Sequence, residues 1–221
     1  MSRIVKYIVA NTYKPLLVRY LSSTRSYVYK GITVEVPPKV FHPGFFSSTK
    51  LLLRYLEHEP LEGKSFLELG AGSGLISICA AKRGADVVAS DISWSAIRSV
   101  ESNAGTNRVM VEVIHSDLFL NLPLRKFDFI VINPPYYKQK AVTEWDRAWN
   151  CGEKGEYFEE LFRDLRHFMH SGSKVLMVLC DGCDLEMISE MANDNSFEMI
   201  CVHTSKTLLE RNFIFQIEIM A

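Results

Sequence analysis

Four consecutive residues, Asn133-Pro134-Pro135-Tyr136, combine groups that can hold and activate an amino nitrogen. The side-chain oxygen of Asn133 and the backbone carbonyl of Pro134 can both accept hydrogen bonds from one NH2 group. This draws the nitrogen toward tetrahedral geometry and stabilises the positive charge that grows as it attacks. The prolines fix the backbone and have no N–H to compete, while Tyr136 offers an aromatic face to a planar amide or base. A strand end followed by surface tyrosines is the simpler alternative, so the chemical interpretation depends on what lies beside this motif.

A glycine-rich turn, ELGAGSG at residues 68–74, stands between a predicted strand and a predicted helix. Glycines at such a turn let the backbone approach a ligand closely. A dinucleotide-binding fingerprint needs another glycine at the sixth position counted from Gly70, where this chain has Leu75. The difference disfavours a nicotinamide-dependent dehydrogenase and favours a site for another nucleotide-like ligand. The candidate ligand-binding residues of the turn are Glu68, Gly70, Ala71, Gly72 and Gly74.

Two carboxylates stand at the ends of the next two predicted strands. Asp91 lies about 20 residues beyond the glycine turn, where a carboxylate can hold the two hydroxyls of a ribose. Asp117 lies at the tip of the following strand, where it can accept a hydrogen bond from an adenine amino group. Either residue alone could simply cap a helix. Together with the glycine turn they predict a nucleoside site, because open α/β sheets bind ligands at the carboxyl ends of their strands.

Alternating apolar strands and amphipathic helices must position these residues. The alternation predicts a doubly wound, mostly parallel α/β sheet with helices on both faces. No helix separates the last two strands, so we expect them to pair antiparallel. The predicted strands are 65–70, 85–91, 109–117, 127–133, 174–180, 197–204 and 212–220, and the predicted helices are 48–58, 74–84, 93–105, 156–169 and 184–194.

The chain is predicted to have a small extension at residues 1–45, ahead of a main domain at residues 46–221. Residues 3–21 have amphipathic helical spacing that is interrupted near Pro15. Residues 26–36 alternate around a Lys-Gly pair, which predicts a hairpin. We therefore expect the extension to consist of helix plus hairpin.

The charge of the chain is distributed unevenly. Residues 1–50 contain eight Lys or Arg but a single acid, Glu35, whereas residues 51–221 contain 17 Lys or Arg and 25 Asp or Glu. The asymmetry indicates either that the extension contacts an anionic partner such as nucleic acid, or that it packs against the acidic body. The stretch before Glu35 lacks acids and contains serines, so an organelle transit peptide is a further alternative.

Four segments together, LELGAGSG, ASDIS, HSDLF and INPPY, resemble the class I S-adenosylmethionine-dependent methyltransferases over roughly residues 46–221. The resemblance implies a seven-stranded Rossmann-like sheet of order 3-2-1-4-5-7-6 with an antiparallel last strand. It also implies that Glu68, Gly70 and Gly72 line the methionine end of the cofactor. By the same resemblance Asp91 binds the ribose, Ile92 lies against the adenine, and Asp117 and Leu118 face the adenine edge. Asn133 then borders both the cofactor and the acceptor.

The Asn-Pro-Pro-Tyr motif resembles that of the amino-group methyltransferases, which act on adenine, guanine or cytosine amino groups or on a glutamine amide. The segment VFHPGFFSSTKLLL resembles both release-factor glutamine methyltransferases and small RNA base methyltransferases. Gly152, Gly155 and Phe158 match a Gly-x-x-Gly-x-x-Phe segment of the glutamine enzymes, and Cys151 departs from it. We therefore expect a glutamine amide of a protein as the acceptor. The alternatives are an RNA or DNA base (adenine N6 or guanine N2) and a non-catalytic cofactor-binding module.

Composition narrows the class of protein further. No apolar run approaches the roughly 18 residues that cross a membrane. The five cysteines are an odd number, which favours free thiols in a reducing compartment, and we expect a cytoplasmic protein. Cys180 and Cys183 have the spacing of a zinc or redox pair, but neither further ligands nor a thioredoxin-like context is evident, so we expect a structural role. The histidines show no ligand spacing, and no metal is predicted.

Overall fold

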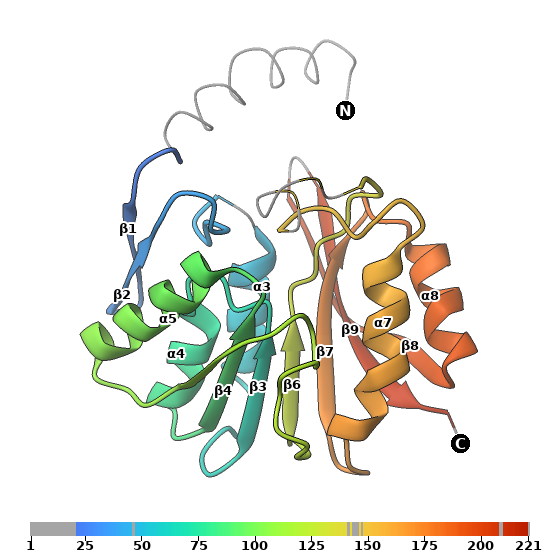
Figure 1. The fold of residues 1–221 in the computed structure, drawn as a ribbon. Helices are drawn as coiled ribbons and strands as arrows, with labels where there is room; N and C mark the ends of the chain where they lie inside the picture. The colour runs from blue at the N-terminus through green and yellow to red at the C-terminus, as the bar shows by residue number, and fades with distance from the viewer. Residues whose placement is uncertain are drawn as a thin grey trace.

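The computed structural model describes residues 21–45, 47–140, 142, 146, 148–207 and 210–220. The amphipathic helices predicted before residue 21 lie outside the described residues. The hairpin and the main domain lie within them, and the carboxyl edge of the main sheet carries the candidate site (Figure 1).

The main sheet of the described chain has seven strands in the order β5-β4-β3-β6-β7-β9-β8 (Figure 1). Numbered along this domain, that is the expected order 3-2-1-4-5-7-6. Neighbouring strands from β5 to β7 pair parallel, and β9 pairs antiparallel with both β7 and β8, which confirms the predicted topology. The strands are β3 Ser65–Leu69, β4 Asp86–Asp91, β5 Glu112–His115, β6 Phe129–Ile132, β7 Lys174–Cys180, β8 Phe197–Lys206 and β9 Arg211–Ile219.

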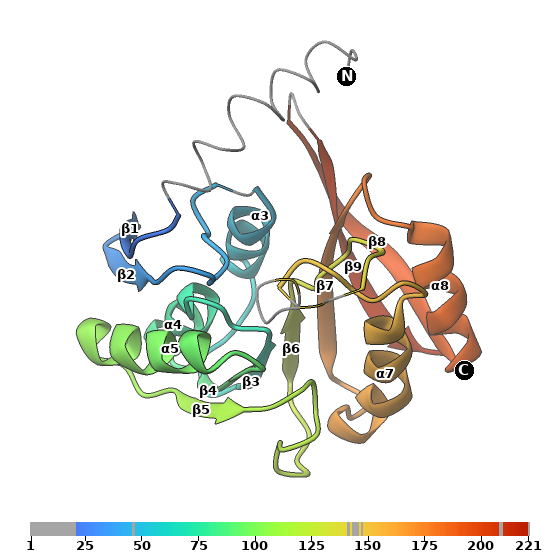
Figure 2. The same ribbon diagram turned by 45° about the horizontal axis from the view of Figure 1, so that its top comes forward.

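Helices cover both faces of this sheet (Figure 2). On β3, Phe66 packs into the cluster beneath the helices of one face, whereas Leu67 packs into the cluster of the opposite face. Strands buried on both sides need continuous apolar runs, which is what the sequence provides. Within the described residues, no helix has both the length and the apolar character that a bilayer span requires. The helices are α3 Ser47–Leu56, α4 Leu75–Lys82 and α5 Trp94–Asn107 on one face, and α7 Glu156–Leu165, the short 3-10 turn η2 Arg166–Phe168 and α8 Leu185–Asp194 on the other.

Strand β5 is shorter than its predicted range of 109–117. The preceding helix α5 ends at Asn107 and is capped by Arg108, which adopts the left-handed conformation with a φ of 56°. The N–H of Val109 then donates to the carbonyl of Ala104, so the first residues of the predicted strand close the helix instead.

The predicted hairpin is confirmed as β1 Arg25–Tyr29 and β2 Ile32–Val36. Two asparagines on α5 bind the free edge of β2 as another strand would. Asn103 accepts from the Glu35 N–H at 2.8 Å and donates to the Glu35 carbonyl at 2.9 Å. Asn107 accepts from the Thr33 N–H at 3.2 Å and donates to its carbonyl at 2.7 Å. The hairpin is thereby held on the main domain, and the connector after it runs past the glycine turn.

Candidate active site

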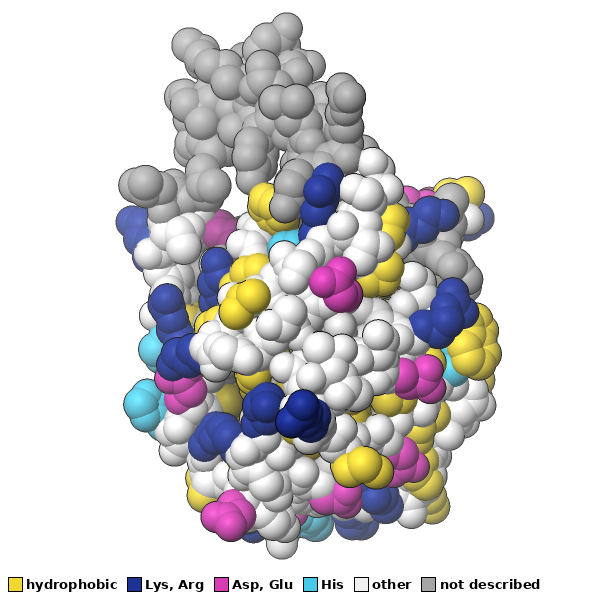
Figure 3. Space-filling model, turned by 90° about the vertical axis from the view of Figure 1, so that its left-hand side faces the viewer, with side chains coloured by type: hydrophobic (Ala, Val, Ile, Leu, Met, Phe, Trp, Pro, Cys, Tyr) yellow, Lys and Arg dark blue, Asp and Glu magenta, His cyan; other side chains and the backbone are white. Residues whose placement is uncertain are grey.

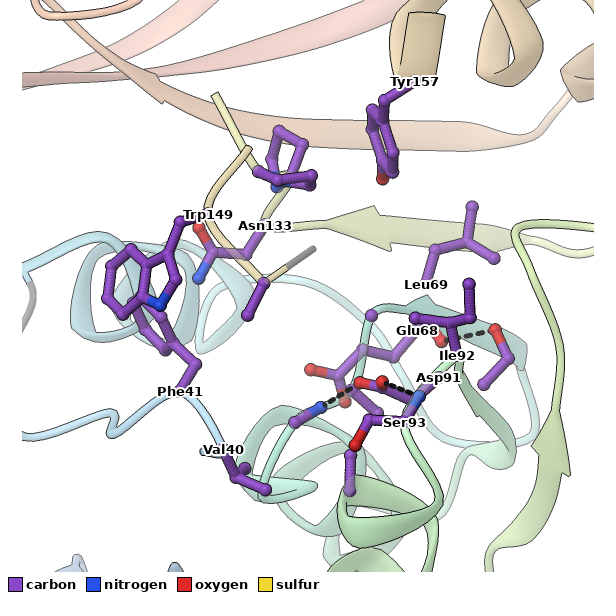
Figure 4. Close-up of a pocket in the computed structure, with 18 of the residues that line it drawn as sticks. Val40, Phe41, Glu68, Leu69, Asp91, Ile92, Ser93, Asn133, Trp149 and Tyr157 are labelled. Carbon is purple, nitrogen blue, oxygen red and sulfur yellow. Dashed lines mark hydrogen bonds between the residues drawn. The ribbon is translucent and has the colours of Figure 1, made fainter. Parts of the chain in front are cut away.

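A cavity of about 390 Å³ opens at the carboxyl ends of β3, β4 and β6 (Figure 4). Its lining includes the connector after β2, the glycine turn, the ends of β4 and β5, the motif after β6 with the segment that pairs with it, and Tyr157 of the helix at residues 156–165. The topology therefore brings together residues that are far apart in the sequence. The predicted site residues that line the cavity are Glu68, Gly70, Ala71, Gly72, Asp91, Ile92, Asp117, Leu118, Asn133, Pro134, Pro135 and Tyr136.

The glycine turn owes its shape to left-handed backbone conformations. Gly70, Gly72 and Gly74 have φ angles of 73°, 55° and 76°, which side chains other than glycine rarely allow. The N–H groups of Gly70 and Ala71 both donate to the Ser90 carbonyl at 2.9 Å, which ties the turn to β4. Gly74 does not line the cavity. A Cβ at Gly74 would lie 3.0 Å from Val100, so this glycine instead permits α4 and α5 to approach closely.

Asp91 connects the glycine turn to the start of α5. One carboxylate oxygen accepts from the Gly72 N–H and the other from the Ser93 N–H, each at 2.9 Å (Figure 4). Burial raises the pKa of Asp91, and these backbone donors and the nearby His115 oppose that rise. Each carboxylate oxygen retains a lone pair for a further donor. The residue can therefore hold a pair of ligand hydroxyls, as the sequence predicts.

Glu68 is almost fully buried at the end of β3. It accepts hydrogen bonds from both the backbone N–H and the hydroxyl of Ser77, in the first turns of α4. Burial, followed by the negative charge of Asp91, raises the pKa of Glu68 to about 8 despite those hydrogen bonds. At neutral pH the residue is therefore mostly protonated, and it joins β3 to α4 behind the glycine turn.

The raised pKa of Glu68 predicts a pH dependence of stability. An unfolded glutamate titrates near 4.5, whereas folded Glu68 keeps its proton up to about pH 8. Between these values the folded state holds the additional proton, so the free energy of unfolding falls as pH rises, by up to about 1.4 kcal/mol per pH unit. We expect Glu68→Gln to flatten this slope in urea unfolding followed by circular dichroism. Glu62→Gln, at an exposed glutamate, should keep it, and equal slopes in all three proteins would contradict the assignment.

Asn133 lies half-buried at the end of β6 and borders the cavity (Figure 4). Among the described residues, none forms a hydrogen bond with its side chain or with the carbonyl of Pro134. Tyr136 is also half-buried, and burial raises the pKa of its hydroxyl, which stays protonated. The two acceptors predicted from the motif thus belong to residues that line the cavity, and neither has a hydrogen-bond partner among the described residues.

A short pairing between two loops shapes the wall beside Asn133. The carbonyl of Trp149 accepts from the N–H groups of Tyr136 at 3.0 Å and Tyr137 at 2.8 Å, and the Cys151 N–H donates back to the Tyr137 carbonyl at 2.9 Å. This pairing places the Trp149 ring next to Asn133 (Figure 4). The Trp149 and Phe41 rings lie 5.2 Å apart with an interplanar angle of 45°.

Sequence reasoning missed several cavity residues. Val40 and Phe41 begin the stretch VFHPGFFSSTKLLL, whose resemblance to known methyltransferases did not mark them as site residues, and Trp149 precedes the Gly-x-x-Gly-x-x-Phe segment. Tyr157 lies within that segment and directs its hydroxyl into the cavity (Figure 4), and burial raises its pKa. The available signals were the resemblance of the stretch that begins at Val40 and, for Tyr157, this segment, in which Phe158 is buried.

The chain is similar in sequence and in fold to known methyltransferases. A family model described as the methyltransferase small domain matches residues 31–188. A putative protein N5-glutamine methyltransferase of Methanocaldococcus jannaschii is 34% identical over 152 residues, covering 66% of this chain and 75% of that protein. Ribosomal RNA small subunit methyltransferase C of Haemophilus influenzae is 33% identical over 143 residues, covering 58% of this chain but only 42% of that protein. The solved Thermus thermophilus 16S rRNA N2 G1207 methyltransferase, in complex with AdoMet and guanosine, shares the fold with a TM-score of 0.60 and 22% identity, covering 87% of this chain and 50% of that one.

Proposed function

Since the chain belongs to the methyltransferase small domain family and is an S-adenosylmethionine-dependent methyltransferase, we propose that it methylates the NH2 nitrogen of a planar group. The observation that carries this proposal is the pair of available acceptors, the Asn133 side-chain oxygen and the Pro134 carbonyl. They lie at the edge of a cavity that also contains the glycine turn and Asp91. A bare strand end would not need to present both acceptors to a cavity.

The cavity fits the cofactor in size and in donor set. Its volume of about 390 Å³ falls within the range of small-molecule sites. We assign the ribose hydroxyls to Asp91, the methionine end to Glu68, Gly70 and Gly72, and the adenine to Ile92 and the edge formed by Asp117 and Leu118. When bound, S-adenosylmethionine supplies an electrophilic methyl group on a sulfonium.

The acceptor end of the cavity is suited to orienting a weak nucleophile. The Asn133 side-chain oxygen and the Pro134 carbonyl each accept a hydrogen bond from the substrate NH2. These hydrogen bonds direct the nitrogen lone pair and stabilise its growing positive charge. We call the Phe41–Trp149 pair the aromatic wall. Tyr136 and the aromatic wall together hold the planar group in place. No ionised side chain and no covalent nucleophile is required for these roles.

The preferred acceptor is a glutamine side-chain amide of a protein. Support comes from the glutamine methyltransferase relative, of which the chain covers 75%, and from Gly152 and Gly155, which have left-handed φ angles of 93° and 86° before α7. The second candidate is an RNA base, because a wall of two rings exceeds what a small amide needs and suits stacking of a base. Lys and Arg side chains are also scattered over the face that carries the hairpin, with acidic ones between them (Figure 3). A cytoplasmic location stays a prediction.

Radiolabelling separates these acceptors. The full-length protein is incubated with tritiated S-adenosylmethionine and a cell extract, which is then split by nuclease and protease treatment into protein and RNA fractions. We expect label in the protein fraction, recovered as N5-methylglutamine after digestion. Label in methylated adenine or guanine instead supports the RNA candidate. No transfer to either fraction, with the cofactor bound in calorimetry, would leave the non-catalytic module as the better description.

Removal of the aromatic wall should weaken acceptor binding. Trp149→Ala takes away one ring while leaving Asp91 and the glycine turn intact, so we expect the acceptor KM to rise by about tenfold. The dissociation constant of S-adenosylmethionine should stay within about twofold. Trp94→Ala is the matched control, because Trp94 is exposed, stacks on His115 and does not line the cavity. An unchanged acceptor KM in Trp149→Ala would show that the wall plays no part in recognition.

A further inference from the structure

Two cysteines at the end of β7 face one another outside the cavity. Cys180 is the last residue of β7, and Cys183 closes the turn that leads to α8. Their sulfur atoms are 3.7 Å apart. The Cys183 sulfur also accepts a hydrogen bond from the Cys180 backbone N–H at 3.2 Å, and the Cys183 N–H donates to the Cys180 carbonyl at 3.0 Å. The structural role expected from sequence does not require the two sulfurs to be directed at each other in this way.

The geometry of this turn is compatible with a disulfide. Residues three apart in a tight turn have Cα atoms within about 7 Å, which overlaps the usual disulfide range of roughly 4.4–6.8 Å. The sulfurs would have to approach by roughly 1.7 Å to reach bonding distance. Cys183 is partly exposed and Cys180 is buried, so a small reagent reaches the pair from the Cys183 side. The hydrogen bond from the Cys183 thiol lowers the pKa of Cys180, which favours the thiolate needed for exchange.

We propose that Cys180 and Cys183 are a modification site at which a reversible intramolecular disulfide forms and displaces the acceptor end of the active site. The oxidant is a small-molecule disulfide of the glutathione type. One cysteine forms a mixed disulfide and releases one glutathione thiol, and the other cysteine then attacks and releases the second. In total the two protein thiols lose two protons and two electrons, one sulfur–sulfur bond forms in the protein, and that of the oxidant breaks.

Contacts of the next residue carry the change to the active site. Asp184 directly follows Cys183, accepts from the Met187 N–H at 3.2 Å as the cap of α8, and forms an ion pair with Lys138 at 3.0 Å. Lys138 lies two residues beyond Tyr136 in the segment that follows the Asn-Pro-Pro-Tyr motif. The ion pair is partly exposed and contributes little to stability. It nevertheless joins the cysteine turn to this segment, and this is the contact through which we infer that contraction of the turn alters the segment.

The cysteine turn and the Asn-Pro-Pro-Tyr motif also follow neighbouring strands. Burial raises the pKa of Tyr136 and Tyr137, and negative charge on Cys180 or Cys183 raises both further. Strands β6 and β7 are parallel neighbours with Ile132 beside Met177, so the motif and the cysteine turn leave the same edge of the sheet. Oxidation therefore takes place beside the acceptor end and away from Asp91.

Mass spectrometry tests whether the disulfide forms. The full-length chain is equilibrated in buffers of reduced and oxidised glutathione, alkylated and digested with trypsin. The tryptic peptide 175–206 also contains Cys201, so the test uses Cys201→Ser, which leaves only the proposed pair in that peptide. We expect the oxidised peptide to carry no alkyl group and to have a mass about 2 Da below that of the same peptide with two free thiols, because two hydrogens leave. Dithiothreitol should reverse this change. Two alkylated cysteines in excess oxidised glutathione, or a stable mixed disulfide, would overturn the proposal.

A second measurement tests the coupling to the active site. Hydrogen exchange over residues 133–140 should be faster in the oxidised chain than in the reduced one, and methyl transfer to the labelled extract fraction should fall on the order of tenfold. The affinity for S-adenosylmethionine should stay within about twofold. In Cys183→Ser, the oxidant should change neither the hydrogen exchange over residues 133–140 nor the rate of methyl transfer. If the disulfide forms while exchange and transfer stay the same, the site is a modification without the proposed effect on the acceptor end.

Discussion

Asn133→Ala is expected to lower the rate of methyl transfer by roughly 100- to 1000-fold, the usual cost of removing one preorganised hydrogen-bonding group from a site of developing charge. In the proposed mechanism the side-chain oxygen of Asn133 and the Pro134 carbonyl are the two hydrogen-bond acceptors for the substrate NH2, and the variant loses the first of them. The Pro134 carbonyl alone cannot both orient the nitrogen and balance its growing positive charge. Single-turnover kinetics with tritiated S-adenosylmethionine measure this rate directly.

The affinity for S-adenosylmethionine decides whether Asn133 acts on the acceptor. Because the glycine turn and Asp91 are unchanged, calorimetry should give a dissociation constant within about twofold of the parent chain. Asn193→Ala is the matched control, since Asn193 is exposed on α8 and lies outside the cavity. A variant of Asn133 that transfers methyl groups at close to the parent rate would remove this residue from the chemistry.

The strands of the sheet could be predicted because a strand that is buried on both faces needs a continuous run of apolar residues. Strand β7 was predicted to the residue, as residues 175–180 are all buried and form one apolar run. The left-handed turn at Gly70 and Gly72 was predictable for a related reason, since only glycine serves there without strain. Strand β5 was less predictable, because Val109 has the residue type of a strand but is used to close α5.

The aromatic wall was not predictable because tertiary contacts, and not local pattern, place its two rings. Phe41 follows a hairpin whose position depends on Asn103 and Asn107 of α5, which bind the edge of β2. Trp149 is placed by hydrogen bonds to a segment twelve residues earlier. Neither segment has helical or strand periodicity. The motif itself was readable because Asn133 and Pro134 perform their proposed chemistry at adjacent positions, without help from a remote partner.

Position on α5 also explains why one asparagine can contact both the hairpin and the glycine turn. In addition to its bonds with Glu35, the Asn103 amide donates to the carbonyl of Ser73 at 2.9 Å. Asn103 is buried, so the loss of these partners would leave polar groups unsatisfied. The hairpin, α5 and the glycine turn are therefore linked through one side chain. The connector that bears Phe41 follows this hairpin and packs against Gly72.

The second large effect is expected at Asp91. Asp91→Asn should raise the dissociation constant of S-adenosylmethionine by roughly 10- to 100-fold, because hydrogen bonds to a charged group contribute about 1.5–3 kcal/mol. The carboxylate now accepts the Gly72 and Ser93 N–H groups on different oxygens. An amide has a single acceptor oxygen, so its NH2 group would oppose one of those N–H donors and would offer only half of a site for a ribose diol.

Asp86→Asn provides the matched control at the other end of the same strand. Asp86 begins β4, is mostly exposed and lies 3.6 Å from the Arg125 guanidinium, far from the cavity lining. Calorimetry should give Asp86→Asn the affinity of the parent chain. Because the amide would leave the Gly72 or the Ser93 N–H without its acceptor, Asp91→Asn is expected to be less stable than the parent chain, so the titration is run at a temperature at which circular dichroism shows both variants to be folded. If folded Asp91→Asn binds S-adenosylmethionine within about twofold of the parent chain, the ribose is held by other residues.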